Sequence, residues 1–153
     1  MTAALAQELV AARTELYALL EAVEPSRRDR PSLVGDWSAR ELIAHLGYWA
    51  GHATELIHAV ESGRGAEVGL DEPSVDERNE TVARIARQTD LATARKREAA
   101  SVHALLDRLT ALDPTLLGVR LPDGASLEDA IREDGSAHYR EHADQLRVPP
   151  SAR

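Results

Sequence analysis

Two histidines near the end of the chain have the spacing of a metal-chelating pair. His138 and His142 are four residues apart within residues 126–147, a segment that we predict to be one helix. Residues at this spacing lie about 40° apart around a helix, so both imidazoles can converge on one point beside its axis. In a chain with six histidines, such a pair is also compatible with two buried side chains held by ordinary hydrogen bonds. This helix alone leaves both interpretations open.

The predicted helix carries an apolar stripe that turns polar partway along. Its positions at helical spacing are Leu127, Ala130, Ile131, Asp134, His138, His142 and Gln145. An amphipathic helix buries such a face against its neighbours, and buried polar groups need partners. We therefore expect the two histidines to bind something inside the protein, either a metal ion or other polar side chains.

A third histidine is predicted to face inward from an earlier helix. Ser38 and Glu41 form an S-x-x-E capping box that starts this helix, and residues 62–65, with two glycines, end it. The apolar positions in between recur at helical spacing and share their face with His45. Three neutral imidazoles on a divalent ion would form an open, catalytic type of site, because a structural zinc ion usually has four protein ligands.

Four further residues are candidates for roles beside such a site. His52 lies on nearly the same helical face as the third histidine and is a candidate general base, fourth ligand or substrate contact. Asp134 is a candidate for the carboxylate that holds the far nitrogen of a ligating histidine. Trp49 and Asn79 are the candidates for contacts to a cofactor, at the pocket wall and the pocket mouth. The alternatives are core packing for Trp49 and simple exposure for His52 and Asn79.

Composition restricts the possible chemistry. The 153 residues include no cysteine, so thiol chemistry would have to use the thiol of a substrate or cofactor. A net charge of −8 with scattered basic residues disfavours binding to nucleic acid. The sequence lacks a leader-like N-terminus and any apolar run of the roughly 18 residues that span a membrane. We expect a cytoplasmic protein that acts on a small molecule.

The hydrophobic periodicity predicts an all-α protein. The expected helices cover residues 2–24, 38–62, 74–112 and 126–147, and the third is polar over residues 87–99, where we expect a bend or an exposed face. Four capped amphipathic helices favour a four-helix bundle, and the long connections argue against a plain up-down-up-down order. Residues 1–148 are expected to form one domain, followed by a short tail at 149–153.

Two segments resemble a known family. GDWSARELIAHLGYW, around His45, and HYREHADQL, near the end of the chain, are similar to the DinB/YfiT-like superfamily, which includes metal-dependent thiol transferases and mycothiol-dependent isomerases. The resemblance implies a four-helix bundle of up-down-down-up order with zinc or nickel on His45, His138 and His142. One departure follows the last histidine, where a typical member reads His-Arg-Gly-Gln and this chain has alanine and aspartate before Gln145.

The resemblance implies an enzyme that joins a low-molecular-weight thiol, such as mycothiol, to an electrophilic small molecule. A divalent ion on three neutral ligands keeps its charge and lowers the pKa of a bound thiol or water molecule. Hydrolysis is the other use of such a site. The alternative function is a self-resistance protein that sequesters or hydrolyses a reactive compound without a thiol cofactor. A bundle with a role in assembly is the third possibility, and the sequence permits a homodimer.

Overall fold

The chain forms an all-α bundle in the computed structural model, which describes residues 2–148. The long helices are α1 (Thr2–Ala22), α3 (Ala39–Glu61) and α5 (Leu91–Ala111), and the fourth arm consists of α6 (Leu127–Asp134) and α7 (Ser136–Arg147). The connections contain α2 (Pro25–Arg28), α4 (Val75–Ala86) and the short 3₁₀ helices η1 (Gly65–Glu67) and η2 (Pro114–Gly118). The tail predicted at residues 149–153 lies outside the described residues.

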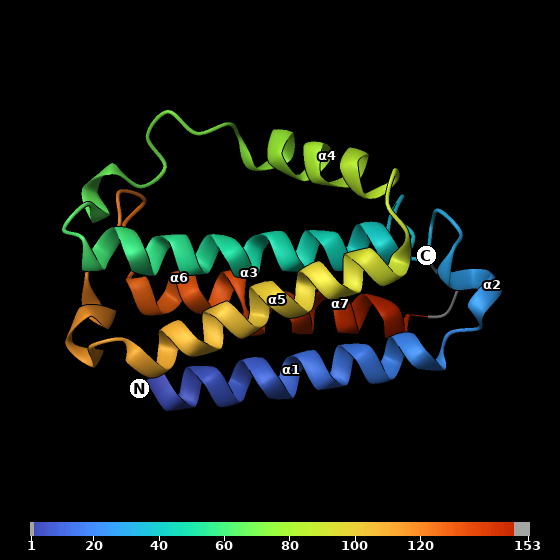
Figure 1. The fold of residues 1–153 in the computed structure, drawn as a ribbon, viewed down its shortest axis with the longest axis horizontal. Coiled ribbons are helices and arrows are strands. Elements are labelled where there is room, and N and C mark those ends of the chain that lie inside the picture. The colour runs from blue at the N-terminus through green and yellow to red at the C-terminus, as the bar shows by residue number, and fades with distance from the viewer. Residues whose placement is uncertain (1, 149–153) are drawn as a thin grey trace.

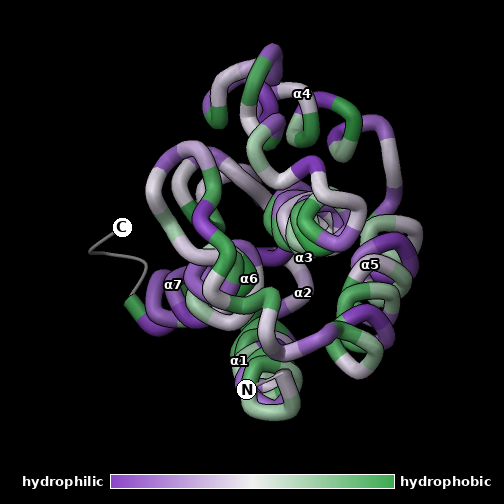
Figure 2. Tube along the Cα trace, turned by 90° about the vertical axis from the view of Figure 1, so that its left-hand side faces the viewer, coloured by the Kyte–Doolittle hydropathy of each residue, from purple (hydrophilic) through white to green (hydrophobic). Residues whose placement is uncertain are grey.

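The four arms follow the up-down-down-up order that the resemblance implied. Figure 1 shows α1 and the α6–α7 arm running in one direction, and α3 and α5 in the other. The consecutive long helices α3 and α5 can run parallel because the connection between them returns along the bundle. Helix α4 forms most of this connection. In the end view of Figure 2, α4 lies outside the bundle over α3, with α5 on one side and α6 and α7 on the other.

Helix α3 is the central element. It packs against α5, α4 and α6, and its apolar side chains Leu42, Ile43, Leu46 and Ile57 are fully buried. Side chains with well-defined rotamers fill the core around it at high density, which holds the helix in one register. Any residue of α3 that faces the α6–α7 arm is therefore held rigidly.

A buried carboxylate joins three of the arms. Glu98 on α5 is 1% exposed, and its two oxygens accept hydrogen bonds from Arg13 Nε at 2.6 Å and Nη2 at 2.7 Å. The hydroxyls of Tyr17 and Tyr139 donate to the same carboxylate at 2.8 and 2.5 Å. Because every partner lies on α1 or α7, this network fixes the position of α7 relative to the rest of the bundle.

The third predicted helix is two helices. Residues 87–90 interrupt it, and the Asp90 side chain accepts a hydrogen bond from the Thr93 amide and caps the start of α5. We expected a bend or an exposed face in this region, and the structure has a full break. Ile85 on α4 is an apolar residue and yet is 52% exposed, because α4 lies outside the bundle.

The last predicted helix is also interrupted. Gly135, with φ −108° and ψ −109°, separates α6 from α7. A Cβ atom at this position would lie 2.8 Å from the carbonyl oxygen of Ile131, so the break depends on glycine. The predicted stripe is wrong at its end, because Gln145 is exposed and the core face of α7 is formed by Tyr139 and Ala143.

Within residues 2–148, every helix is too short or too polar to cross a membrane.

Candidate metal centre

A capping box presents the first histidine. The Glu41 carboxylate accepts hydrogen bonds from the amide of Ser38, at 2.8 Å, and from its hydroxyl, which fixes the first turn of α3. His45 follows one turn later, on the face towards the α6–α7 arm, and is 5% exposed. Glu41 is occupied by the cap, as the sequence predicted, and is not a partner of the histidine.

Helix α7 supplies the other two imidazoles. The break at Gly135 starts a new helix whose first two turns bring His138 and His142 to α3. The ring centroid of His45 lies 4.5 Å from that of His138 and 5.1 Å from that of His142, and the two α7 rings are 4.9 Å apart. One nitrogen from each ring lies within 4.8 Å of the other two. The structure thus brings together the three histidines that the sequence analysis selected.

Hydrogen bonds orient the two imidazoles of α7. The Nδ1–H of His142 donates to Gln145 Oε1 at 2.7 Å, because an amide oxygen can only accept. His138 bonds to the backbone carbonyl of Asp134. Both rings therefore carry their proton on the outer nitrogen and keep the lone pair of Nε2 free for a cation. The first of these bonds uses Gln145, whose exposed position the sequence analysis misjudged.

The three imidazoles are neutral at pH 7. Burial lowers the pKa of His45 to about 2, with the other two rings adding to the shift, and burial followed by the proximity of His142 lowers the pKa of His138 to about 4. Burial also lowers the pKa of His142. Metal ions bind neutral imidazole, so the ligand set is ready without the loss of a proton.

This donor set fits a divalent ion. Nε2 of His45 and Nε2 of His138 lie 2.7 Å apart and can share only one proton. Nδ1 of His45 is buried and has no hydrogen-bond partner among residues 2–148. Because His138 and His142 direct their protons outward, the nitrogens that face one another carry two lone pairs and at most one N–H, from His45. Such a cluster is poorly satisfied by itself, whereas zinc and nickel ions accept imidazole nitrogens readily.

Aromatic rings wall the pocket above the cluster. The pocket has a volume of about 350 Å³ and includes Trp37, Trp49 and Asn79. The indole of Trp49 donates to Asn79 Oδ1 at 2.8 Å, which ties α4 to α3. Trp37 lies 4.6 Å from His45 between ring centroids, and this tryptophan was not among the residues predicted for the site. Its position just before the capping box was the available signal.

His52 and Asp134 form a pair at the edge of this pocket. Nδ1 of His52 lies 2.6 Å from Oδ2 of Asp134. Burial raises the pKa of the carboxyl group and the neighbouring histidine opposes the shift. Nε2 of His52 is buried and has no partner among the described residues. We expected the Asp134 carboxylate beside a ligand histidine, and it is bonded to His52 instead. The backbone carbonyl of Asp134 accepts the hydrogen bond from the candidate ligand His138.

An adjoining hollow of about 420 Å³ extends the pocket. It shares Trp49, Asp134 and Val75 with the histidine pocket and includes His52. Arg78 on α4 lies over the Trp49 ring, 4.9 Å from its centroid. Val68, Gly69, Leu70 and Glu72, from the connection after α3, complete the wall.

The fold and the histidine cluster define a DinB-like helical bundle with a candidate metal centre. Comparison with known families identifies it further: residues 9–143 match the mycothiol maleylpyruvate isomerase N-terminal domain, and the chain belongs to this family. The family lies within the DinB/YfiT-like superfamily that the sequence resembled. No curated protein matches the sequence.

Solved structures share the fold at low sequence identity. An uncharacterised protein from Escherichia coli UTI89 has a TM-score of 0.80 and 13% identity, over 96% of this chain and 91% of that one. The mycothiol-dependent maleylpyruvate isomerase has a TM-score of 0.74 and 19% identity, over 97% of this chain but 61% of its own. The colibactin self-resistance protein ClbS, solved with double-stranded DNA, has a TM-score of 0.73 and 16% identity, over 95% and 92%.

The DNA in the ClbS structure bears on the partners expected here. The net charge of −8 was the basis for expecting no nucleic acid, and a protein of the same fold has been solved on DNA. The absence of nucleic-acid binding therefore stays a prediction.

Proposed function

We propose that this protein is a metal-dependent transferase or isomerase that joins a low-molecular-weight thiol of the mycothiol type to an electrophilic small molecule. His45, His138 and His142 would hold zinc or nickel. The observation that carries the proposal is the meeting of three neutral imidazoles, from α3 and α7, in one cluster. Membership of a family named after a mycothiol-dependent isomerase supports a thiol as the second reactant.

A bound divalent ion would supply Lewis-acid activation of a thiol or of water at neutral pH. The chain's own residues have separate tasks. Burial keeps the three imidazoles unprotonated and available. Trp49, whose indole is fixed by the hydrogen bond to Asn79, forms part of the pocket wall. We assign to these two residues the contacts with the thiol cofactor.

His52 is the proposed proton carrier. Asp134 accepts from Nδ1 and so leaves the lone pair on Nε2, which faces no other partner among residues 2–148. A histidine held in one tautomer by a carboxylate can accept a proton from a reacting group and return it later in the reaction. The hollow next to the histidine cluster gives the electrophile room to reach this nitrogen.

Metal content is the first test. Protein purified without an affinity tag or chelator is compared with the His138→Ala/His142→Ala variant by elemental analysis. The expected result is about one zinc or nickel ion per chain, lost in the variant. His58→Ala/His103→Ala is the matched control, because both of these histidines are exposed. Metal that persists in the first variant, or its absence from the wild type after loading, would refute the centre.

A self-resistance function is the second candidate. The chain shares its fold with ClbS over 92% of that protein and with the isomerase over 61% of that one. The two candidates differ in their need for a thiol. Turnover of electrophiles only in the presence of a small thiol supports the transferase, whereas equal consumption of a reactive compound without thiol supports the resistance protein.

A further inference from the structure

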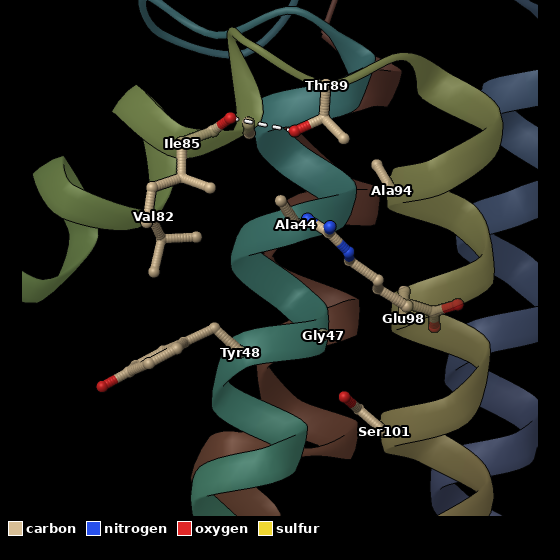
Figure 3. Close-up of a pocket in the computed structure, with 11 residues that line it drawn as sticks. Ala44, Gly47, Tyr48, Val82, Ile85, Thr89, Ala94, Glu98 and Ser101 are labelled. Carbon is tan, nitrogen blue, oxygen red and sulfur yellow. Dashed lines mark hydrogen bonds between the residues drawn. The ribbon is translucent and has the colours of Figure 1, made fainter.

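A separate apolar cavity lies beneath the second half of α4. It is half-open, has a volume of about 230 Å³ and is lined mainly by residues of α3, α4 and α5. In Figure 3, Val82 and Ile85 reach from α4 towards α3, and Tyr48 closes one end. None of its lining residues belongs to the histidine pocket or to the adjoining hollow.

The cavity exists because of how the three helices meet. α4 rests on α3 and hardly touches α5. Beneath it, α3 and α5 approach closely, since a Cβ atom at Gly47 would lie 2.9 Å from Cα of Glu98. Ala44 and Ala94 have no side chain long enough to fill the remaining space. The void is therefore built into the crossing of the helices.

The rim exposes apolar surface that a ligand would cover. Ile85 is 52% exposed and Tyr48 is 37% exposed, and both line the cavity. Contiguous exposed apolar side chains around a concavity are typical of ligand-binding grooves. A concave shape of this volume suits a small molecule better than the flat face of another protein.

The charged residues at the cavity favour a ligand with an anionic head group. Two ionised residues line the cavity, Arg97 and Glu98. The Glu98 carboxylate points away towards α1 (Figure 3) and is neutralised by Arg13. Arg97 forms no ion pair with any residue of the described range 2–148. A second cation, Arg40, donates to the carbonyl of Thr89 at the cavity wall at 3.4 Å.

We propose that this cavity is a binding site for a small carboxylate with an apolar chain. The chain lies beneath Val82 and Ile85, and the carboxylate pairs with Arg97. An apolar cavity of about 150 Å³ holds a benzene molecule, so the space available here admits a larger apolar body. The proposal is independent of the metal centre, because the two sites share no lining residue.

Octanoate and its uncharged analogue 1-octanol are the probes. Each is titrated into the full chain and followed by calorimetry. We expect one octanoate per chain, bound about 10-fold more tightly than octanol. Arg97→Gln should lower the octanoate affinity to that of octanol, whereas Lys96→Gln, which removes an exposed charge outside the cavity, should leave it unchanged.

A cavity-filling variant locates the bound chain. Ala44→Leu places a side chain in the cavity and should abolish binding of both probes, whereas Ala100→Leu, on the exposed side of α5, should not. Circular dichroism and a urea titration check that both variants are folded. The proposal is overturned by equal affinity for the two probes, by binding that survives Ala44→Leu, by loss of binding in His138→Ala, or by a dimer that Ala44→Leu dissociates.

Discussion

The side chain of Gln145 accepts a hydrogen bond from Nδ1 of His142 at 2.7 Å, across one turn of α7. This exposed amide selects the tautomer in which Nε2 of the histidine is free to bind a cation. Outer hydrogen bonds of this kind orient metal ligands and typically change metal affinity 10- to 100-fold when removed.

Gln145→Leu should therefore weaken zinc binding about 10- to 100-fold without unfolding the protein, because the side chain lies at the surface. Competition with a chromophoric chelator measures the affinity. Gln145→Glu, which keeps an acceptor, should bind at least as tightly as the wild type. Equal affinity of the leucine variant would show that the hydrogen bond has no part in the site.

Asp134→Asn should separate proton transfer from metal binding. The NH2 group of the asparagine can donate a hydrogen bond to Nδ1 of His52, which moves the proton of the ring to Nε2. The backbone carbonyl that accepts the hydrogen bond from His138 is retained. We expect unchanged metal content and a fall in thiol-dependent turnover of about 10-fold or more. Nitrogen NMR of the His52 ring should report the new tautomer. Unchanged turnover with a changed tautomer would remove His52 from the mechanism.

Glu98→Gln should destabilise the fold by about 3 kcal/mol or more, since breaking one side of a buried ion pair leaves the partner without compensation. The carboxylate is the common acceptor for Arg13, Tyr17 and Tyr139. Urea unfolding measures the loss. Glu55→Gln, an exposed change on α3, is the control and should alter stability little. Equal effects of the two substitutions would contradict the structural role of the network.

The metal-free protein should lose stability in acid. The pKa of His45 falls to about 2 and that of His138 to about 4 on folding, from about 6.5 in the unfolded chain. The unfolded state therefore binds more protons, and stability present above pH 6.5 declines as the pH falls towards the folded values. Well below pH 6.5 the expected slope is about 1.4 kcal/mol per pH unit for each of these histidines.

Urea titrations with EDTA between pH 7 and pH 5 measure this slope. His138→Gln should reduce it, because one buried titrating group is removed. His58→Gln, at an exposed position, should leave it unchanged. A slope that is the same in all three proteins would mean that the imidazoles are protonated in the folded state.

Local signals in the sequence were sufficient for much of the fold. The capping box at Ser38 is present as predicted, and Ser74 and Ser126 start α4 and α6 with the same motif. Each capping box uses only atoms within one turn of a helix. The hydrophobic period likewise predicted the all-α class. The spacing of His138 and His142 determined that both could serve one site, since residues four apart share a helical face.

Tertiary structure decided what depends on residues far apart in the chain. His45 meets His138 across 93 residues, and His52 meets Asp134 across 82. The helical period alone predicted that these histidines face inward, and the family resemblance implied that His45 and His138 share one site. The break at Gly135 was missed because a single glycine is tolerated within a helical pattern; it becomes decisive only where the neighbouring backbone leaves no room for a Cβ atom. The helical pattern therefore determined which residues share a face, and the packing of α3 against α6 and of α7 against α1 determined which faces meet.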